Sequence, residues 1–291
     1  MDRSGFVRSK IDGTQLWWGS VGSGHPVVLC DGFACDGFIW PYVIDDFYEH
    51  LQLVRPHYRG HGNSEKPRRK GIVHVEDFCD DLVTVLDELD IEKAVFAGHS
   101  MGVQVILQFF ALYPERVEAL IPICGTYKRP LDTFHNHDKL ATLLPFLEKA
   151  VRFAPERLQS LWQTLTPSPM TFHIAARTSE INSKFVRKQD FQPYLEHVAK
   201  MDLRVFMRML KGLAEHSAEE ILETIDVPTL VIAGEFDSFT PTQRSLEMHD
   251  GIAGSQLLVV PGGTHVAPVE LPDLVNSAIE KFLKSHGLWD S

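Results

Sequence analysis

Short apolar runs alternate along most of the chain with longer segments in which apolar residues recur every three to four positions. The short runs have the length and β-branched content of buried strands, and they lie at 26–30, 52–58, 93–98, 119–124, 228–237 and 255–263. The longer segments have the period of amphipathic helices, and they lie at 39–51, 74–90, 101–113, 242–249 and 272–285. This alternation predicts an α/β fold.

The beginning of the chain predicts a different pairing. Residues 6–10 and 15–22 are short apolar stretches on either side of Asp12-Gly13, a dipeptide typical of hairpin turns. They predict an antiparallel pair of strands. Counting this pair, we expect a mostly parallel, twisted sheet of eight strands with helices on both of its faces.

Between residues 126 and 219 the alternation stops and the pattern is helical throughout. The expected helices lie at 139–153, 155–165, 191–200 and 203–213. Prolines are expected to divide this block, at Pro145, Pro155, Pro167, Pro169 and Pro193. We interpret the block as a helical cap, or lid, over residues 126–219. It is inserted after about the sixth strand of a core made of residues 1–125 and 220–291.

Composition excludes several classes of function. The chain has 291 residues, 44% of them hydrophobic, and a net charge of −11, which argues against a nucleic-acid partner. No apolar run approaches the roughly 20 residues of a membrane span, and residues 1–10 lack the apolar segment of a signal peptide. Four cysteines without metal-type spacing are expected to be reduced: Cys30, Cys35, Cys79 and Cys124. We expect a cytoplasmic protein that binds no metal, and a homodimer remains open.

The segment 98–102, Gly-His-Ser-Met-Gly, places a serine between two glycines where a strand meets a helix. A strand that turns sharply into a helix leaves no space for side chains beside the turn, so Gly98 and Gly102 fit there. Ser100 would then project at the start of the helix, and it would need a base to act as a nucleophile. The five residues alone are also compatible with a serine that only caps the helix.

Two later segments supply a base and an acid. His265 lies in a Gly-rich loop after the last apolar run, and Asp237 lies at the end of the run before it, with Glu235 as a rival. Since the carboxyl ends of parallel strands meet at one edge of a sheet, these residues are expected to converge on Ser100. The sequence therefore predicts a catalytic triad of Ser100, Asp237 and His265.

Acyl transfer also requires two backbone N–H groups that bind the developing oxyanion. Met101, which follows the serine, is expected to supply one. The loop after residues 26–30 is expected to supply the other from Phe33, because Gly32 allows the backbone to approach a substrate closely. A plain glycine turn is the alternative for this loop.

These four segments, in this order, resemble the α/β-hydrolase fold family, and within it the capped esterases, lactonases and haloperoxidase-like enzymes. The resemblance extends over about residues 6–284 and includes the segment 58–67. It implies that Ser100 is the nucleophile, with Asp237 as acid, His265 as base, and Phe33 and Met101 as oxyanion donors. Family members that open epoxides or remove halogens attack with a carboxylate, so the serine implies acyl transfer. The resemblance implies neither a metal nor an organic cofactor.

The oxyanion loop departs from the family pattern. Asp31-Gly32 stands where His-Gly is usual, and a carboxylate close to a developing oxyanion opposes it unless the carboxylate points away or is paired. Arg55, His57 and Arg59 are candidate partners for Asp31.

Three functions follow from these residues. The first is a serine hydrolase that cleaves a carboxylic ester or lactone of a small to medium apolar substrate through an acyl-enzyme. The second is a carbon–carbon bond hydrolase or thioesterase on the same triad, and carbon–carbon cleavage would call for a cation in the cap, where Arg177 is available. The third is a ligand-binding protein of this fold without turnover, which the intact triad disfavours.

Aromatic residues of the cap favour an apolar substrate, although the same spacing is typical of the cap's own core. They are Phe134, Phe146, Phe153, Trp162, Phe172, Phe185, Phe191, Tyr194 and Phe206.

Overall fold

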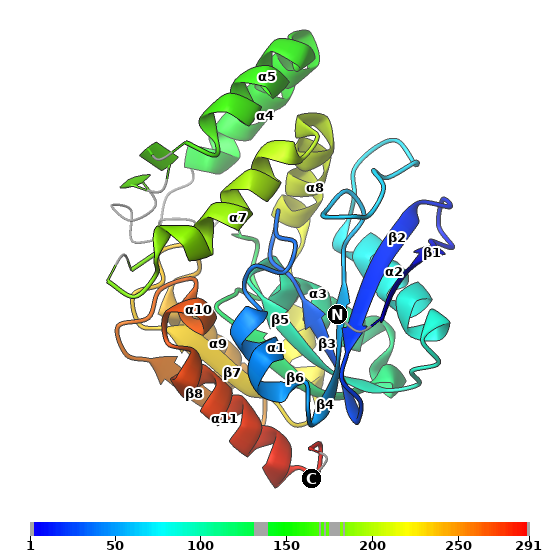
Figure 1. The fold of residues 1–291 in the computed structure, drawn as a ribbon, viewed down its shortest axis with the longest axis vertical. Helices are drawn as coiled ribbons and strands as arrows, with labels where there is room; N and C mark the ends of the chain where they lie inside the picture. The colour runs from blue at the N-terminus through cyan, green and yellow to red at the C-terminus, as the bar shows by residue number, and fades with distance from the viewer. Residues whose placement is uncertain are drawn as a thin grey trace.

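The computed structural model describes residues 3–130, 139–168, 170–171, 173–174, 181–182 and 184–289. A single eight-stranded sheet lies at its centre, with helices on both faces (Figure 1). The strands are β1 (Arg3–Arg8), β2 (Gln15–Val21), β3 (His25–Cys30), β4 (Leu51–Pro56), β5 (Ala94–His99), β6 (Val117–Ile123), β7 (Leu230–Gly234) and β8 (Gln256–Val260). β1, β2 and β4 pair antiparallel, and all other pairs are parallel. The predicted fold class is confirmed.

Helices provide the crossovers that parallel strands require. They include α1 (Pro41–Phe47), α2 (Val75–Glu88), α3 (Met101–Leu112) and α9 (Thr242–Gly251), with the short 3₁₀ helices η1 (Pro114–Arg116) and η4 (Glu219–Thr224). Two further helices, α10 (Ala267–Glu270) and α11 (Pro272–Ser285), follow the last strand. None of the described helices is long and apolar enough to cross a membrane.

The order of strands across the sheet is β1-β2-β4-β3-β5-β6-β7-β8. The chain therefore runs outward from β3 to β4 and then returns to the other side of β3 as β5. Such a reversal leaves a crevice outside the carboxyl ends of the two strands, because their following loops diverge. Cys30, the last residue of β3, pairs with Gly98 of β5. The loop with Phe33 and the turn with Ser100 therefore begin side by side.

Between β6 and β7, the described part of the chain contains the helices that the sequence pattern predicts: α4 (Lys139–Phe153), α5 (Pro155–Leu165), α7 (Lys188–Lys200) and α8 (Leu203–Glu215). They stand together at one end of the sheet (Figure 1). The expectation that Pro145 and Pro193 divide the block is wrong, because these residues lie inside α4 and α7. A proline removes one backbone hydrogen bond from a helix, and here the helix continues on both sides of it.

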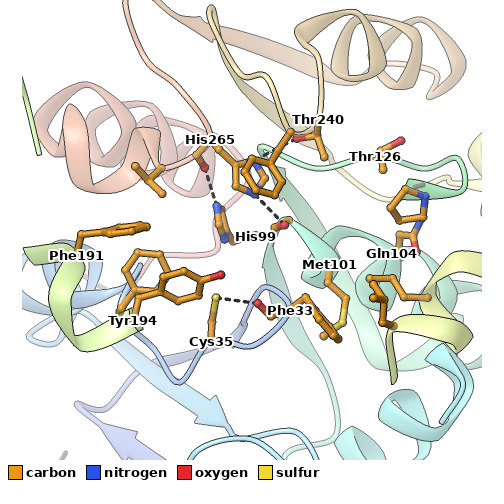
Figure 2. Close-up of a pocket in the computed structure, with 17 residues that line it drawn as sticks. Phe33, Cys35, His99, Met101, Gln104, Thr126, Phe191, Tyr194, Thr240 and His265 are labelled. Carbon is orange, nitrogen blue, oxygen red and sulfur yellow. Dashed lines mark hydrogen bonds between the residues drawn. The ribbon is translucent and has the colours of Figure 1, made fainter. Parts of the chain in front are cut away.

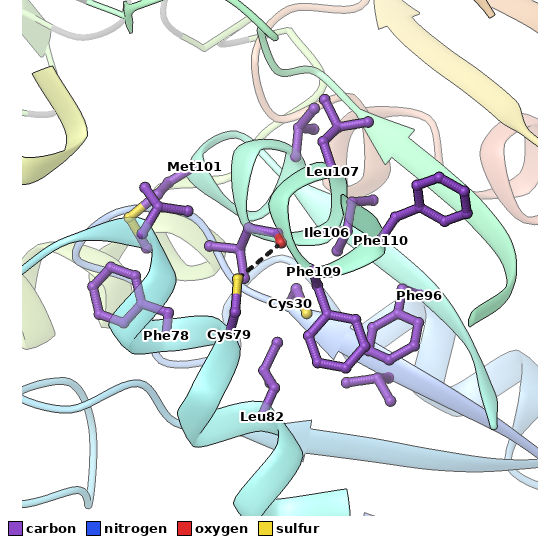
Figure 3. Packing of buried hydrophobic residues seen from close by; sticks show 14 of the residues in the cluster. Cys30, Phe78, Cys79, Leu82, Phe96, Met101, Ile106, Leu107, Phe109 and Phe110 are labelled. Atoms are coloured by element: carbon purple, nitrogen blue, oxygen red, sulfur yellow. Dashed lines mark hydrogen bonds between the residues drawn. The ribbon is translucent and has the colours of Figure 1, made fainter. Parts of the chain in front are cut away.

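Two hydrophobic clusters, one on each face of the sheet, form the core. On one face α3 is buried between the sheet and α2, and Figure 3 shows Phe109 of α3 beside Phe96 of β5, with Leu82 of α2 below them. On the other face α1 and α11 cover the sheet with side chains such as Phe47 and Phe282. All four cysteines are buried and free. Because α3 is held on both sides, its first turn offers a rigid base for a functional residue.

A buried ion pair fixes the loop that follows β4. Arg59, 1% exposed, donates from Nε and Nη2 to the two carboxylate oxygens of Asp81 in α2, each at 2.6 Å. It also donates to Ser9 Oγ at 3.0 Å, and its Nη1 lies 3.6 Å from Asp12 in the hairpin turn. One guanidinium therefore joins this loop to α2 and to the β1–β2 hairpin.

We predict that Arg59→Met lowers the free energy of unfolding by about 3–5 kcal/mol, because it leaves Asp81 buried without its counter-charge. Urea unfolding at pH 7 measures this. The double variant Arg59→Met/Asp81→Asn should recover part of the loss. A loss below about 1 kcal/mol in the single variant would show that the pair does not hold this loop.

Candidate active site

Ser100 lies at the turn between β5 and α3, with a backbone φ of 56° and ψ of −115°. This conformation is strained for a residue with a side chain, and such strain is typical of functional turns. A Cβ atom on Gly98 would lie 2.4 Å from the carbonyl oxygen of Gly102, and one on Gly102 would lie 2.2 Å from that of Cys30. Both positions therefore require glycine, since three backbone segments touch here.

The three residues of the predicted triad lie together. His265 Nε2 is 2.9 Å from Ser100 Oγ, and His265 Nδ1 is 2.9 Å from Asp237 Oδ2. They follow β5, β7 and β8, whose carboxyl ends lie at the same edge of the sheet. The rival acid, Glu235, instead accepts the backbone N–H of Gly262 at 2.8 Å. The geometry thus places an imidazole between a hydroxyl and a carboxylate.

Three further groups hold the carboxylate of Asp237. The backbone N–H groups of Phe239 and Thr240 donate to Oδ1 at 2.9 and 2.8 Å, and Thr240 Oγ1 donates to Oδ2 at 2.8 Å. The ring of Phe239 also stacks on that of His265, with centroids 4.9 Å apart. Neither Phe239 nor Thr240 is among the residues predicted from the sequence, although a turn that follows an aspartate is a signal for such contacts.

His99, the residue before the serine, fixes the backbone of the histidine. Its Nε2 lies 2.8 Å from the carbonyl oxygen of His265. Burial lowers the pKa of His99 to about 3, so the ring is neutral and Nε2–H is the donor. His99 is not among the site residues predicted from the sequence.

The two predicted oxyanion donors border the serine. A Cβ on Gly32 would lie 3.1 Å from Ser100 Cβ, so the loop after β3 passes next to the serine. Phe33 and Met101 both line the cavity into which the serine opens. Met101 is the first residue of α3, and its N–H has no acceptor within the helix. The arrangement therefore leaves room for a substrate carbonyl between the loop and the helix.

Asp31 points away from this cavity. Its side chain is 1% exposed, does not line the cavity, and accepts a hydrogen bond from Trp40 Nε1 at 2.7 Å. Burial raises the pKa of Asp31 to about 7, although the charge of Arg55 and the bond from Trp40 oppose the rise. The tryptophan was not among the expected partners.

Two of the three expected partners, Arg59 and His57, do not neutralise the charge of Asp31. Arg59 pairs with Asp81 instead. Burial lowers the pKa of His57 to about 3, so His57 carries no charge near neutral pH. Of the three expected partners, Arg55 acts on Asp31 as a cation, but burial outweighs it and the pKa of Asp31 is about 7.

The cavity has a volume of about 170 Å³, and Ser100 lies in its wall. Figure 2 shows Phe191 and Tyr194 of α7 at one end, Gln104 and Thr126 at the other, and His265 between them. Among the described residues that line it, none is Asp, Glu, Lys or Arg. The site is suited to an uncharged, largely apolar ligand.

The other aromatic residues of the inserted helices have different places. Trp162 packs against Phe206 with ring centroids 5.1 Å apart. Phe146, Phe153 and Phe185 are exposed. Phe134, Phe172 and Arg177 lie outside the described residues. Within the described ranges, no cluster of three or more His, Cys, Asp or Glu side chains is arranged to hold a metal ion.

Comparison with known proteins agrees with the fold. The family model for the alpha/beta hydrolase fold matches residues 25–272. One curated relative is a putative carbamate hydrolase of Agrobacterium fabrum, which is 25% identical over 88% of this chain and 92% of its own length. Another is the bifunctional epoxide hydrolase 2 of Sus scrofa, which is 24% identical over 97% of this chain. The chain spans 55% of the porcine enzyme. A thermophilic esterase from Thermogutta terrifontis has a similar structure, with a TM-score of 0.76, 23% identity, and coverage of 98% of this chain and 99% of the esterase.

Asp31 gives a prediction for the pH dependence of stability. Its pKa is about 7 in the folded protein against an ordinary value of 3.8, so between these pH values the folded state keeps a proton that the unfolded state has lost. The free energy of unfolding therefore falls as the pH rises through this window. Asp31→Asn removes the effect and retains an acceptor for Trp40.

We expect the stability of Asp31→Asn relative to the wild type to increase by about 2–3 kcal/mol between pH 4.5 and pH 8. Urea unfolding of both proteins at the two pH values measures it. A stability difference that stays constant with pH would show that Asp31 is ionised and paired with Arg55.

Proposed function

Since the chain belongs to the α/β-hydrolase fold family, we propose that it is a serine hydrolase that cleaves a carboxylic ester or lactone of a small to medium apolar substrate through an acyl-enzyme. The observation that carries this proposal is the chain of hydrogen bonds from Ser100 through His265 to Asp237 at the wall of an apolar cavity.

In the proposed acylation step, Ser100 Oγ attacks the substrate carbonyl carbon while His265 Nε2 takes the hydroxyl proton. Asp237 holds the ring in the tautomer with a proton on Nδ1 and stabilises the imidazolium that forms. The N–H groups of Phe33 and Met101 bind the oxyanion. When the intermediate collapses, the bond to the alcohol oxygen breaks and His265 returns the proton to that oxygen.

In the proposed deacylation step, a water molecule replaces the alcohol. His265 removes a proton from the water, whose oxygen attacks the acyl carbon. The bond to Ser100 Oγ then breaks, and the serine recovers the proton from His265.

The cavity supports an uncharged substrate for this reaction. Burying an ionised group there would cost several kcal/mol, because none of the described lining residues offers a counter-charge. Phe191 and Tyr194 come from α7, so we propose that the inserted helices act as a cap that closes the aromatic end of the site.

The alternatives are less well supported by the described residues. Carbon–carbon cleavage leaves a carbanion or enolate, and thioesters of coenzyme A carry phosphates. Each of these negative charges calls for a cation, and the described residues that line the cavity include neither Lys nor Arg. A relative is named an epoxide hydrolase, but members of the family with that activity attack with a carboxylate, and this chain has Ser100. A binding protein without turnover would not need the complete set of bonds around Asp237.

We predict that Ser100→Ala lowers kcat for the hydrolysis of 4-nitrophenyl butyrate by about 10⁴-fold or more, because no other group replaces the nucleophile. A small fluorophosphonate should add one adduct to the wild type, seen by intact mass, and none to the variant. Ser277→Ala, which changes an exposed serine on α11, is the control and should behave as the wild type. Undiminished activity in Ser100→Ala would refute the proposal.

We further predict that a negative charge on the acyl chain lowers kcat/KM by about 100-fold, since it must lose its hydration in an apolar cavity. The comparison is between 4-nitrophenyl hemisuccinate and its neutral methyl ester, which is slightly longer but uncharged. Equal values for the two esters would mean that the acyl group does not enter the described cavity.

A further inference from the structure

Glu270, at the end of α10, is a buried carboxylate outside the triad. It is 5% exposed and accepts three hydrogen bonds. The backbone N–H of Thr264 donates to Oε2 at 2.6 Å, the hydroxyl of Thr264 donates to Oε1 at 2.7 Å, and the backbone N–H of Asn182 donates to Oε1 at 2.6 Å. Short bonds to a charged acceptor are the strong kind, so this carboxylate holds its partners firmly.

The three donors come from two parts of the chain, the turn that carries His265 and the segment before α7. Thr264 immediately precedes His265, and a Cβ on Gly234 would lie 2.2 Å from the carbonyl oxygen of Thr264. Thr264 is therefore held by β7 on one side and by Glu270 on the other. Asn182 belongs to the segment that leads into α7, and its side chain also donates to the carbonyl oxygen of Gly262 at 3.1 Å. Figure 1 shows α10 close to the beginning of α7.

Neighbouring contacts support the same junction. Ile181 and Val186, on either side of Asn182, are 2% and 3% exposed and pack in the hydrophobic cluster that includes α1 and α11. The segment before α7 therefore packs on the core, and Glu270 adds a hydrogen bond to it by accepting the backbone N–H of Asn182. The same oxygen of Glu270, Oε1, accepts hydrogen bonds from the backbone N–H of Asn182 in this segment and from the hydroxyl of Thr264, the residue before His265.

We propose that Glu270 is a positioning residue that fixes the turn carrying His265 and couples this turn to the docking of the segment before α7. The inference rests on the proposed function of Ser100 and His265. His265 must keep two bonds of 2.9 Å at once, and a displacement of about 1 Å at a reacting group can cost about 100-fold in rate. A carboxylate that anchors the preceding residue limits such displacements.

The role requires the ionised form of Glu270, because each of its three partners is a donor. Burial raises the pKa of Glu270, and the nearby charge of Asp237 adds to the rise, whereas the bonds from Thr264 and Asn182 oppose it. The buried thiol of Cys124, which follows β6, also interacts with this charge. As the pH falls through the pKa of Glu270, the added proton displaces one donor and the clamp weakens.

The test compares the rate at which a small fluorophosphonate labels Ser100 in the wild type, Glu270→Gln, Thr264→Val and Thr264→Ser. Labelling of the wild type checks the proposed function independently, since a wild type that is not labelled refutes that function itself. We expect Glu270→Gln to be labelled about 10-fold or more slowly at pH 8, still to one adduct per chain. Thr264→Val should be about 3-fold slower, and Thr264→Ser should match the wild type because it restores the hydroxyl.

The pH profile separates positioning from packing. The ratio of the wild-type rate to the Glu270→Gln rate should shrink as the pH falls below the pKa of Glu270, because protonated glutamate then resembles glutamine. A ratio that is large but independent of pH would overturn the proposal, as would equal rates at pH 8. If Glu270→Gln does not fold, a wild-type rate in Thr264→Val overturns it.

Discussion

The close backbone packing at the carboxyl ends of β3 and β5 is the constraint on which the rest of the site depends. The two strands pair through Cys30 and Gly98, and the carbonyl oxygen of Cys30 occupies the space that a side chain at Gly102 would need. The chain can turn from β5 into α3 here only with Ser100 in a strained conformation. Because α3 is buried between the sheet and α2, the strain is not relieved by movement of the helix.

Much of the fold and the triad can be predicted from the sequence, because both depend on local patterns. Apolar runs predict the strands, and helical periods predict the helices. The glycines on both sides of Ser100 indicate a tight turn between a strand and a helix. The order of Ser100, Asp237 and His265 along the chain, each at the end of a strand, is enough to expect that they meet. Their convergence requires only that parallel strands point the same way.

The supporting contacts could not be predicted, because they depend on which distant segments the register brings together. Arg59 follows β4, the neighbour of the strand that precedes Asp31, yet it forms its ion pair with Asp81 of α2. Trp40 reaches Asp31 from the beginning of α1, and His99 reaches the carbonyl of His265 across 166 positions. No local pattern separates a tryptophan that donates to a carboxylate from one that only fills the core.

The number of donors around each buried carboxylate explains how charge is distributed in this site. Asp237 receives three donors besides His265, so a negative charge is held where the imidazolium is proposed to form. Asp31 receives one, and among the described residues its other oxygen has no hydrogen-bond partner, so burial favours its neutral form. An aspartate two residues before Phe33 is therefore compatible with an oxyanion hole, because the surroundings that would make its charge harmful also raise its pKa.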